Sequence, residues 1–398
     1  MQTIPTTVAT ASAAGPAPRA ADQLVQQLSK GLAGASPALV MVFASTEQPL
    51  ASVAPIIAAA FPSAKVLGAS TAGEFTERGD TKGAVAAVAI AGTMQVFAGM
   101  ATGLGSDPQR AVRQAIEGLP SGIMGYPHRT SILLLDTMAG KSEEATLLAA
   151  AAMGDEHPLV GGAAGDDLKM HATFVSCGAH ASSDAVVVAQ IFTKAPLGVG
   201  VCHGHRPHSA PLKVTRAKGN IVHEIDGRPA WDVWRDRTRE IARVQGIDVD
   251  ALEASDEGRF LLRFEAGLAA EGGSFKIRAP LARTPEGAIR FSCGLPEGAV
   301  IRITESTPSD QIASAREAAR RARSKVEGGV VAGAIVFDCI CRNLILDQEF
   351  GTAVRAMAEE LGGAPLAGLE TYGEIALDVG DMSGFHNTTS VVLAFPRG

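Results

Sequence analysis

One stretch of sequence recurs three times along this chain, and this repeat constrains the fold more than any other feature. Each copy has an apolar run typical of a buried strand, then a helical stretch, and then a glycine-rich loop with an acid at its end. The three loops are Gly68-Ala-Ser-Thr-Ala-Gly-Glu74, Gly161-Gly-Ala-Ala-Gly-Asp-Asp167 and Gly368-Leu-Glu-Thr-Tyr-Gly-Glu374. The first and third share the pattern G-x-x-T-x-G-E, and the second has Asp after its inner glycine. Three matches in the same context indicate a repeated unit rather than chance.

The segments around these loops predict a mixed α+β fold of the α/β type, in which mixed sheets are flanked by helices. The apolar runs are Leu39–Phe43, Ile132–Leu135 and Ala334–Phe337, and the helical stretches are Leu50–Phe61, Glu143–Met153 and Thr352–Leu361. Extended segments follow the loops, among them Ala84–Ile90, Gln95–Ala98 and Ala185–Phe192. The predicted unit is therefore strand–helix–strand–(Gly-acid loop)–strand.

The stretch between the second and third copies has a different pattern. Its predicted strands are Leu212–Thr215, Phe260–Phe264, Phe275–Ile277, Ala288–Cys293 and Val300–Thr304. A charged helical segment at Trp231–Arg243 separates two runs of strands, and we place a domain boundary there. A further helix begins at Thr307, because Thr as N-cap, Pro308 next and Asp310 third form a capping pattern. We expect two domains, 36–232 and 233–396, after a disordered leader at 1–20.

Length and composition support two packed domains in a reducing compartment. A chain of 398 residues exceeds the usual size of one core, and 46% apolar residues suffice to bury a large one. The net charge of −7 argues against a nucleic-acid binder, since such proteins carry a basic surplus. The five cysteines are scattered, and no apolar window reaches the roughly 20 residues of a membrane span. We therefore expect a cytoplasmic protein with no membrane or nucleic-acid partner.

The Gly–acid loops allow two interpretations. Glycine at a strand end lets backbone N–H groups approach a ligand, and the following acid accepts from an amine or hydroxyl. Alternatively, each loop is a tight turn closed by a carboxylate. The candidate ligand contacts are Ser70, Thr71, Glu74, Asp166, Thr371, Tyr372 and Glu374. No loop matches a P-loop or dinucleotide fingerprint, and Ala72 replaces the last glycine of the hydrolase elbow G-x-S-x-G.

Histidines cluster in the segment Gly200–His208, which presents the imidazoles of His203, His205 and His208 beside the thiol of Cys202. These side chains are ligand types for a transition metal or for haem iron. Their spacing matches no closed zinc site, so we predict no metal centre. The alternative is that these histidines are simply solvated.

Cys339 and Cys341 lie at the end of the third apolar run. Alternate residues of a strand share a face, so both thiols are expected to point the same way. Buried free cysteines behave as small hydrophobic residues, and a redox-sensing role is the alternative.

Several of these motifs, in this order and spacing, resemble the FIST family, whose name refers to F-box and intracellular signal transduction proteins. The matching segments are Gly68–Glu74, Gly161–Asp167, His203-Gly-His-Arg-Pro207 with the Leu212–Thr215 strand, Phe337–Arg342, Thr371-Tyr-Gly-Glu374 and His386-Asn-Thr388. The resemblance runs from about residue 36 to the C-terminus and covers both the N-terminal and the C-terminal FIST domain.

This resemblance implies a non-enzymatic sensor in signal transduction. A bacterial subgroup of the family is similar to haem proteins that sense nitric oxide and regulate a separate histidine kinase or cyclic-di-GMP enzyme. It implies His203 and His386 as haem contacts, with His205 a third candidate and Asn387 a ligand contact. His205 stands where that subgroup tends to have an aromatic residue.

Three hypotheses follow. The first is a haem-based nitric oxide sensor that acts on a separate signalling protein. The second is a sensor of an amino acid or another small metabolite, bound by the Gly–acid loops. The third is a hydrolase that uses Ser70 or Cys339, against which stands the lack of a recognisable nucleophile–base pair.

Overall fold

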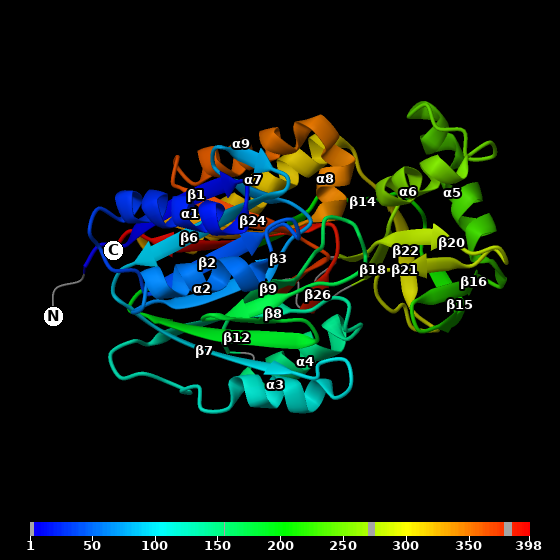
Figure 1. Ribbon diagram of the computed structural model, residues 1–398. Helices are drawn as coiled ribbons and strands as arrows, with labels where there is room; N and C mark the ends of the chain where they lie inside the picture. Colours follow the sequence, from blue (N-terminus) through cyan, green and yellow to red (C-terminus); the bar gives the residue numbers. More distant parts are fainter. Residues whose placement is uncertain (1–3, 155, 270–274, 378–383) are drawn as a thin grey trace.

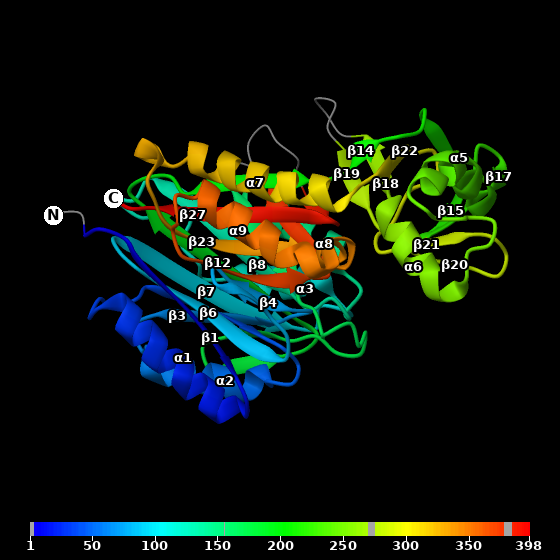
Figure 2. The same cartoon turned by 90° about the horizontal axis from the view of Figure 1, so that it is seen from above.

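The computed structural model describes residues 4–154, 156–269, 275–377 and 384–398. Three six-stranded sheets with their helices form a large body, and a nine-stranded sheet forms a smaller lobe. The lobe lies at one end of the body, and both termini lie at the other end (Figures 1 and 2). The predicted mixed α+β class is confirmed. Among the described helices, none combines the length and apolarity needed to cross a membrane.

The three sheets of the body share one strand order. The first runs β1 (Thr7–Ala14), β6 (Ala84–Ala91), β2 (Leu39–Ala44), β3 (Lys65–Ser70), β10 (Val175–Cys177) and β11 (His180–Ser182). The second runs β7 (Met94–Thr102), β12 (Ala185–Thr193), β8 (His128–Leu135), β9 (Leu159–Ala163), β25 (Gly373–Leu377) and β26 (Gly384–His386). The third runs β13 (Gly198–His203), β27 (Thr389–Pro396), β23 (Val331–Cys339), β24 (Leu366–Thr371), β4 (Glu74–Thr76) and β5 (Gly79–Thr81).

Each sheet contains one parallel pair of strands, namely β2 with β3, β8 with β9, and β23 with β24. Helices connect the strands of each pair because parallel neighbours need a crossover. These helices are α2 (Leu50–Ala60), α4 (Ser142–Met153), and α8 (Ile340–Leu346) with α9 (Phe350–Glu360). Each glycine-rich loop then carries the chain into a different sheet: β4 pairs with β24, β10 with β3, and β25 with β9.

The sheets enclose a central core and carry their helices outside. Phe43, Leu134 and Phe337, one from each sheet, belong to the same buried cluster between the sheets. On the outer faces lie α1 (Ala17–Leu32) with α2, α3 (Pro108–Ile116) with α4, and α7 (Pro308–Ser324) with α9. Helix α7 begins at Thr307 with the predicted capping box, which is confirmed.

The lobe is one sheet packed against two helices. Its order is β19 (Phe275–Arg278), β18 (Ala266–Ala269), β22 (Val300–Glu305), β15 (Leu212–Lys218), β16 (Ile221–Ile225), β21 (Ile289–Phe291) and β20 (Pro280–Arg283). Short strands β14 (Arg206–Pro207) and β17 (Arg228–Pro229) pair with β22 and β16. The predicted boundary segment is helix α5 (Ala230–Val244), and residues from both sides of it share one core. The assignment of domains 36–232 and 233–396 stays a prediction.

Three local predictions were wrong. Residues 7–14 of the predicted leader form β1, whose eight residues pair in register with β6, while residues 1–3 lie outside the described residues. Phe260–Phe264 is not a strand, because it lies mostly in helix α6 (Ala254–Arg263). The third error concerns Cys341, which lies in α8 and not on the strand that ends at Cys339.

Candidate functional site

The acids of the first and third Gly–acid loops are buried inside the body. Thr71 Oγ1 donates to Glu74 Oε2 at 3.0 Å, and Thr371 Oγ1 donates to Glu374 Oε1 at 2.6 Å. Glu74 also accepts from the backbone N–H of Ala84 at 2.8 Å. Burial raises the pKa of Glu74 to about 8 and the pKa of Glu374 well above its ordinary value. These four side chains hold their loops in place and do not line the cavity described below.

Ser70 joins the first loop to the second. Its Oγ donates to the carbonyl of Gly165 at 2.7 Å and accepts from the backbone N–H of Phe174 at 2.9 Å. The side chain is 2% exposed, and both partners are backbone groups. Ser70 therefore acts here as a structural connector.

The second loop leads into a strained turn that Asp166 holds. Asp167, Leu168 and Met170 all have positive φ angles, 54°, 61° and 52°, which L-residues rarely adopt. The Asp166 carboxylate accepts from the backbone N–H groups of Met170, at 2.9 Å, and of His171, at 2.6 Å. It also accepts from Ala172 N–H and from the hydroxyl of Tyr372, the latter at 2.5 Å.

These bonds decide the charge of Asp166. Burial acts to raise its pKa, but the hydrogen bonds from Tyr372 and the backbone outweigh burial, so the pKa is lowered. Burial, together with the hydrogen bond to Asp166, raises the pKa of Tyr372. Asp166 is thus an anion that fixes the turn, and Tyr372 is a neutral donor.

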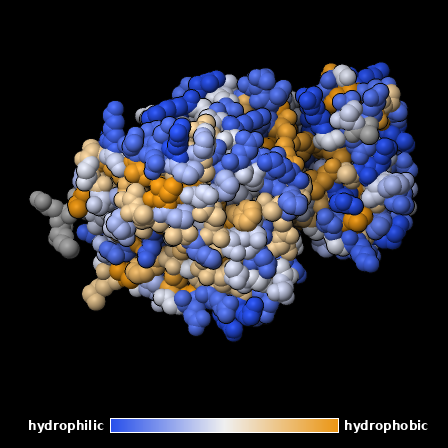
Figure 3. All heavy atoms as spheres, in the orientation of Figure 1, coloured by the Kyte–Doolittle hydropathy of each residue, from blue (hydrophilic) through white to orange (hydrophobic). Residues whose placement is uncertain are grey.

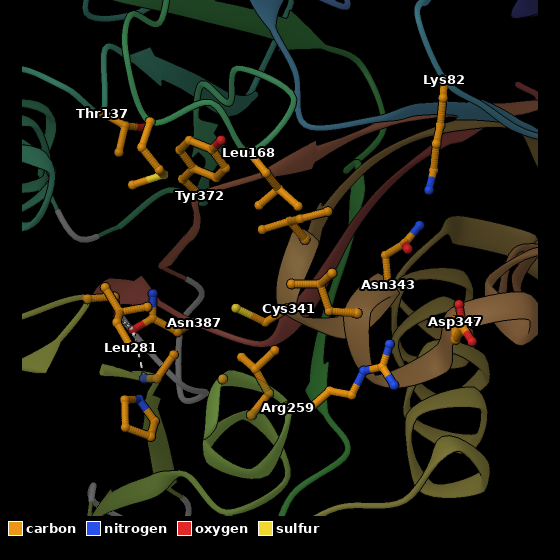
Figure 4. A pocket seen from close by; sticks show the side chains of 18 residues that line it. Lys82, Thr137, Leu168, Arg259, Leu281, Cys341, Asn343, Asp347, Tyr372 and Asn387 are labelled. Atoms are coloured by element: carbon orange, nitrogen blue, oxygen red, sulfur yellow. Dashed lines mark hydrogen bonds between the residues drawn. The ribbon is translucent and has the colours of Figure 1, made fainter. Parts of the chain in front are cut away.

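A cavity of about 490 Å³ lies where the lobe meets the body, and this turn forms part of its wall. Figure 3 shows apolar side chains gathered in the hollow between the two parts. Its apolar lining comprises Leu168, Met170, Leu262, Ala279, Pro280, Leu281, Ile340 and Leu344. Its other lining residues are Lys82, Thr137, Gly258, Arg259, Ser292, Cys341, Asn343, Asp347, Tyr372 and Asn387 (Figure 4).

Both parts of the molecule build this cavity. Helix α6 of the lobe supplies Arg259 and strand β20 supplies Leu281, while α8 of the body supplies Asn343. Leu281 is 43% exposed and Met170 is 57% exposed, so the wall offers apolar surface that the protein itself leaves uncovered. A concave apolar site with a few polar groups, at the junction of two parts, is typical of a small-molecule site.

Asparagine amides lie at two points of the cavity wall. Asn387 Oδ1 accepts from Ser292 Oγ at 2.6 Å. Asn343 Nδ2 donates to Glu370 Oε1 at 2.6 Å, and Glu370 Oε2 is buried with no hydrogen-bond partner among the described residues. Burial raises the pKa of Glu370 to about 8.

The structure therefore brings two predicted contacts, Tyr372 and Asn387, to the cavity, with Asp166 behind Tyr372. Sequence reasoning missed Lys82, Arg259 and Asn343. Asn343 directly follows the Phe337–Arg342 motif, which was a usable signal, whereas Lys82 and Arg259 lie in segments without a motif.

The predicted haem contacts lie outside the lining of this cavity. His203 Nε2 lies 3.1 Å from the carbonyl oxygen of Phe275, and His386 Nε2 lies 3.3 Å from that of Ala376. His205 Nδ1 lies 3.1 Å from Thr304 Oγ1.

Their charge follows from burial. Burial lowers the pKa of His203 to about 4 and that of His386 to about 3, and it lowers the pKa of His205 strongly. All three rings are therefore neutral at pH 7. Since haem needs an axial ligand facing its cavity, these three imidazoles do not fit a haem in this cavity.

Of the two neighbouring cysteines, Cys341 lies in the cavity wall and Cys339 is buried behind it. Burial raises the pKa of Cys339 well above its ordinary value, which disfavours a nucleophilic thiolate. All five cysteines are free. The described residues contain no group of three or more His, Cys, Asp or Glu side chains arranged for a metal ion.

Fold and cavity together define a two-part protein with a ligand-sized site at its junction, built from segments far apart in the sequence. Comparison with protein families matches residues 38–228 to the FIST N domain and residues 230–377 to the FIST C domain. The chain belongs to the FIST family, whose domains are associated with sensing in signal transduction.

Curated relatives are similar to this chain over part of its length. An uncharacterized protein of Mycobacterium bovis is 31% identical over 201 residues, which is 49% of this chain and 49% of that protein. An uncharacterized protein of Mycobacterium tuberculosis is 30% identical over 198 residues, 49% of this chain and 50% of its own length. One from Methanocaldococcus jannaschii is 25% identical over 159 residues, 39% of this chain and 31% of that protein. The chain thus spans half or less of the relatives it matches.

Proposed function

We propose that this FIST protein is a non-enzymatic cytoplasmic sensor that binds a small organic molecule in the cavity between body and lobe. The observation that carries the proposal is the cavity itself, about 490 Å³ in volume and lined from both parts. A ligand that contacts both parts favours the arrangement in which they are close, and a separate signalling protein, such as a histidine kinase or a cyclic-di-GMP enzyme, reads that arrangement.

The contacts of the candidate nucleophiles support a non-enzymatic role. Ser70 is bonded to two backbone groups and is 2% exposed, and Cys339 is 1% exposed. If Ser70→Ala abolished a measured hydrolytic turnover of the purified protein, the sensor proposal would be overturned.

A panel of metabolites tests the proposed site. A ligand that binds only the folded protein raises its melting temperature, and we expect one class of small organic molecule to do so. Leu281→Trp fills the cavity from an exposed position of its wall and should abolish that shift. The matched control is Leu147→Trp, since Leu147 is 58% exposed on α4 and does not line the cavity. A shift that survives Leu281→Trp would place binding elsewhere.

Haem-based sensing of nitric oxide through His203, His205 or His386 stays a prediction. Nδ1 of His386 is buried with no hydrogen-bond partner among the described residues, so this nitrogen could take an iron without giving up a contact. An absorbance spectrum of protein purified from cells supplied with haem tests it. A Soret band that shifts with nitric oxide would support it, and the lack of haem uptake by the apoprotein would exclude it.

A further inference from the structure

We propose that the cavity takes an amphipathic monoanion, a small carboxylate with an apolar chain or ring, whose carboxylate is held between Lys82 of the body and Arg259 of the lobe. This inference rests on the proposed function, because it names the ligand class of the same cavity.

Two cations converge on the cavity from different parts of the molecule. Lys82 lies in the turn between β5 and β6 of the body, and Arg259 lies in α6 of the lobe. In Figure 4 the two side chains extend toward Asn343 from opposite sides. Both are exposed, and within the described part of the chain neither has a carboxylate within 4.0 Å. Among the described residues, the lining contains no other basic side chain, so Lys82 and Arg259 supply its positive charge.

The charge balance of the lining favours a single negative charge on the ligand. Lys82 and Arg259 contribute two positive charges, and Asp347 contributes one negative charge, which leaves one positive charge. Among the lining residues that the structure describes, no other side chain is Asp, Glu, Lys, Arg or His, and Tyr372 is a neutral donor to Asp166. A monoanion neutralises the cavity, whereas a cation adds to its charge.

The rest of the wall determines the other end of the ligand. Leu168, Met170 and Leu281 present partly exposed apolar side chains, and the buried side chains of Ile340 and Leu262 complete the apolar lining. Burying apolar ligand surface against these side chains stabilises the complex by roughly 25 cal/mol per Å² of apolar area. The wall therefore matches a molecule with a hydrocarbon part and one acidic end.

A carboxylate between Lys82 and Arg259 also links body and lobe. An arginine binds a carboxylate through two parallel hydrogen bonds, and a lysine adds a point charge. The contact with Lys82 holds the carboxylate to the body, and the contact with Arg259 holds it to the lobe. A ligand that makes both contacts therefore draws the lobe toward the body. The ligand thereby supplies the differential contact that a shift between arrangements requires.

Calorimetric titration of the full chain with octanoate and phenylacetate tests the proposal, with octylammonium, octanol and leucine as comparisons. We expect the carboxylates to bind and the comparison compounds to bind at least about tenfold more weakly. Octylammonium and octanol lack the carboxylate, whereas leucine keeps it but adds an ammonium group, which leaves no net negative charge for the cavity to neutralise. Lys82→Met and Arg259→Met should each weaken octanoate binding about tenfold. Asp347→Asn should tighten it severalfold, and added salt should weaken it.

Matched controls remove the same charges elsewhere. Lys30→Met and Arg19→Met alter exposed residues of α1 that do not line the cavity, and octanoate binding should be unchanged in both. Melting curves of all variants verify that they are folded.

Several outcomes would overturn the ligand class. One is that neither carboxylate binds. Another is that Lys82→Met and Arg259→Met bind octanoate as tightly as the original chain does. The third is that octylammonium or leucine binds more tightly than octanoate. If another panel member binds and Leu281→Trp abolishes that binding, the ligand class fails but the proposed function stands. If no compound's binding depends on Leu281, both fail.

Discussion

At the scale of single residues, four carboxylates in and beside the Gly–acid loops divide into two groups. Asp166 receives several hydrogen bonds and has a lowered pKa, so it holds the strained turn as an anion. Glu74, Glu370 and Glu374 are buried with raised pKa values. The sequence presented Asp166, Glu74 and Glu374 as equivalent loop acids. Their difference arises because only Asp166 meets a run of backbone N–H groups, which depends on how the turn is folded.

The raised pKa of Glu370 predicts a pH-dependent stability. A carboxyl with a pKa of about 8 in the folded chain and 4.5 unfolded binds its proton more tightly when folded. The stability it contributes is present below about pH 4.5 and is lost as the pH rises toward 8. Glu370→Gln removes this titration and keeps an oxygen for Asn343. Urea unfolding at pH 6, 7 and 8 gives the free energy of unfolding at each pH. In Glu370→Gln this free energy should fall with rising pH less steeply than in the original chain, by on the order of 1 kcal/mol per pH unit.

The matched control is Glu117→Gln, at an exposed glutamate after α3. Its slope should equal that of the original chain. An unchanged slope in Glu370→Gln would mean that Glu370 is ionised throughout this range.

At the scale of elements, small residues set how closely helices approach the sheets. A Cβ on Gly200 of β13 would lie 1.9 Å from the carbonyl oxygen of Ala318 in α7. The apolar face of α7 is likewise made of alanines, among them Ala315, Ala319 and Ala322. The sequence indicated close packing through its alanine and glycine content, but the pairing of β13 with α7 is not visible in it.

Gly200→Ala should therefore destabilise the body. Helix α7 must move away from β13 to admit the methyl group, which costs about 2–3 kcal/mol by comparison with other overpacked cores. Gly122→Ala is the control, because a Cβ there meets nothing within 4 Å. Denaturant unfolding should show a lower midpoint for Gly200→Ala and almost no change for Gly122→Ala. Equal midpoints would contradict the close contact.

At the scale of the whole molecule, one arginine connects lobe and body. Arg278 of β19 is 2% exposed, donates to the carbonyl of Phe385 at 2.9 Å, and forms an ion pair with Glu143 of α4. Where the chain passes from β13 of the body to β14 of the lobe, His205 lies 3.6 Å from Glu265, and both residues are buried. Such polar contacts allow the lobe to change position more readily than a fully apolar interface would.

Arg278→Met should loosen the lobe while leaving the body folded. The two tryptophans, Trp231 and Trp234, both lie in α5 of the lobe, so their fluorescence follows the lobe. Circular dichroism follows the whole chain. In Arg278→Met we expect the midpoint of thermal unfolding measured by fluorescence to lie several degrees below the midpoint measured by circular dichroism. The control is Arg290→Met, at an exposed arginine of the same lobe, in which the two midpoints should coincide. Coincident midpoints in Arg278→Met would contradict a connecting role.

The sequence by itself determined the fold class, most strands and helices, the helix start at Thr307 and the family, because these follow from local periodicity and motif order. It did not determine the short apolar run Phe260–Phe264, where five residues are too few to separate a helix from a strand. The leader was misjudged because β1 is stabilised by pairing with β6, whose residues lie 70 to 84 positions further along the chain.

Tertiary structure alone decided the candidate site. Lys82, Arg259 and Asn343 are distant in sequence and belong to β5–β6, α6 and α8. They line one cavity because the chain crosses between sheets and because the lobe folds back against the body. Which side chains share a cavity depends on packing between distant segments, and no local pattern records it. The neighbours of a loop acid and the charge of a buried carboxyl were likewise decided by the tertiary structure, since both depend on the groups that surround the side chain.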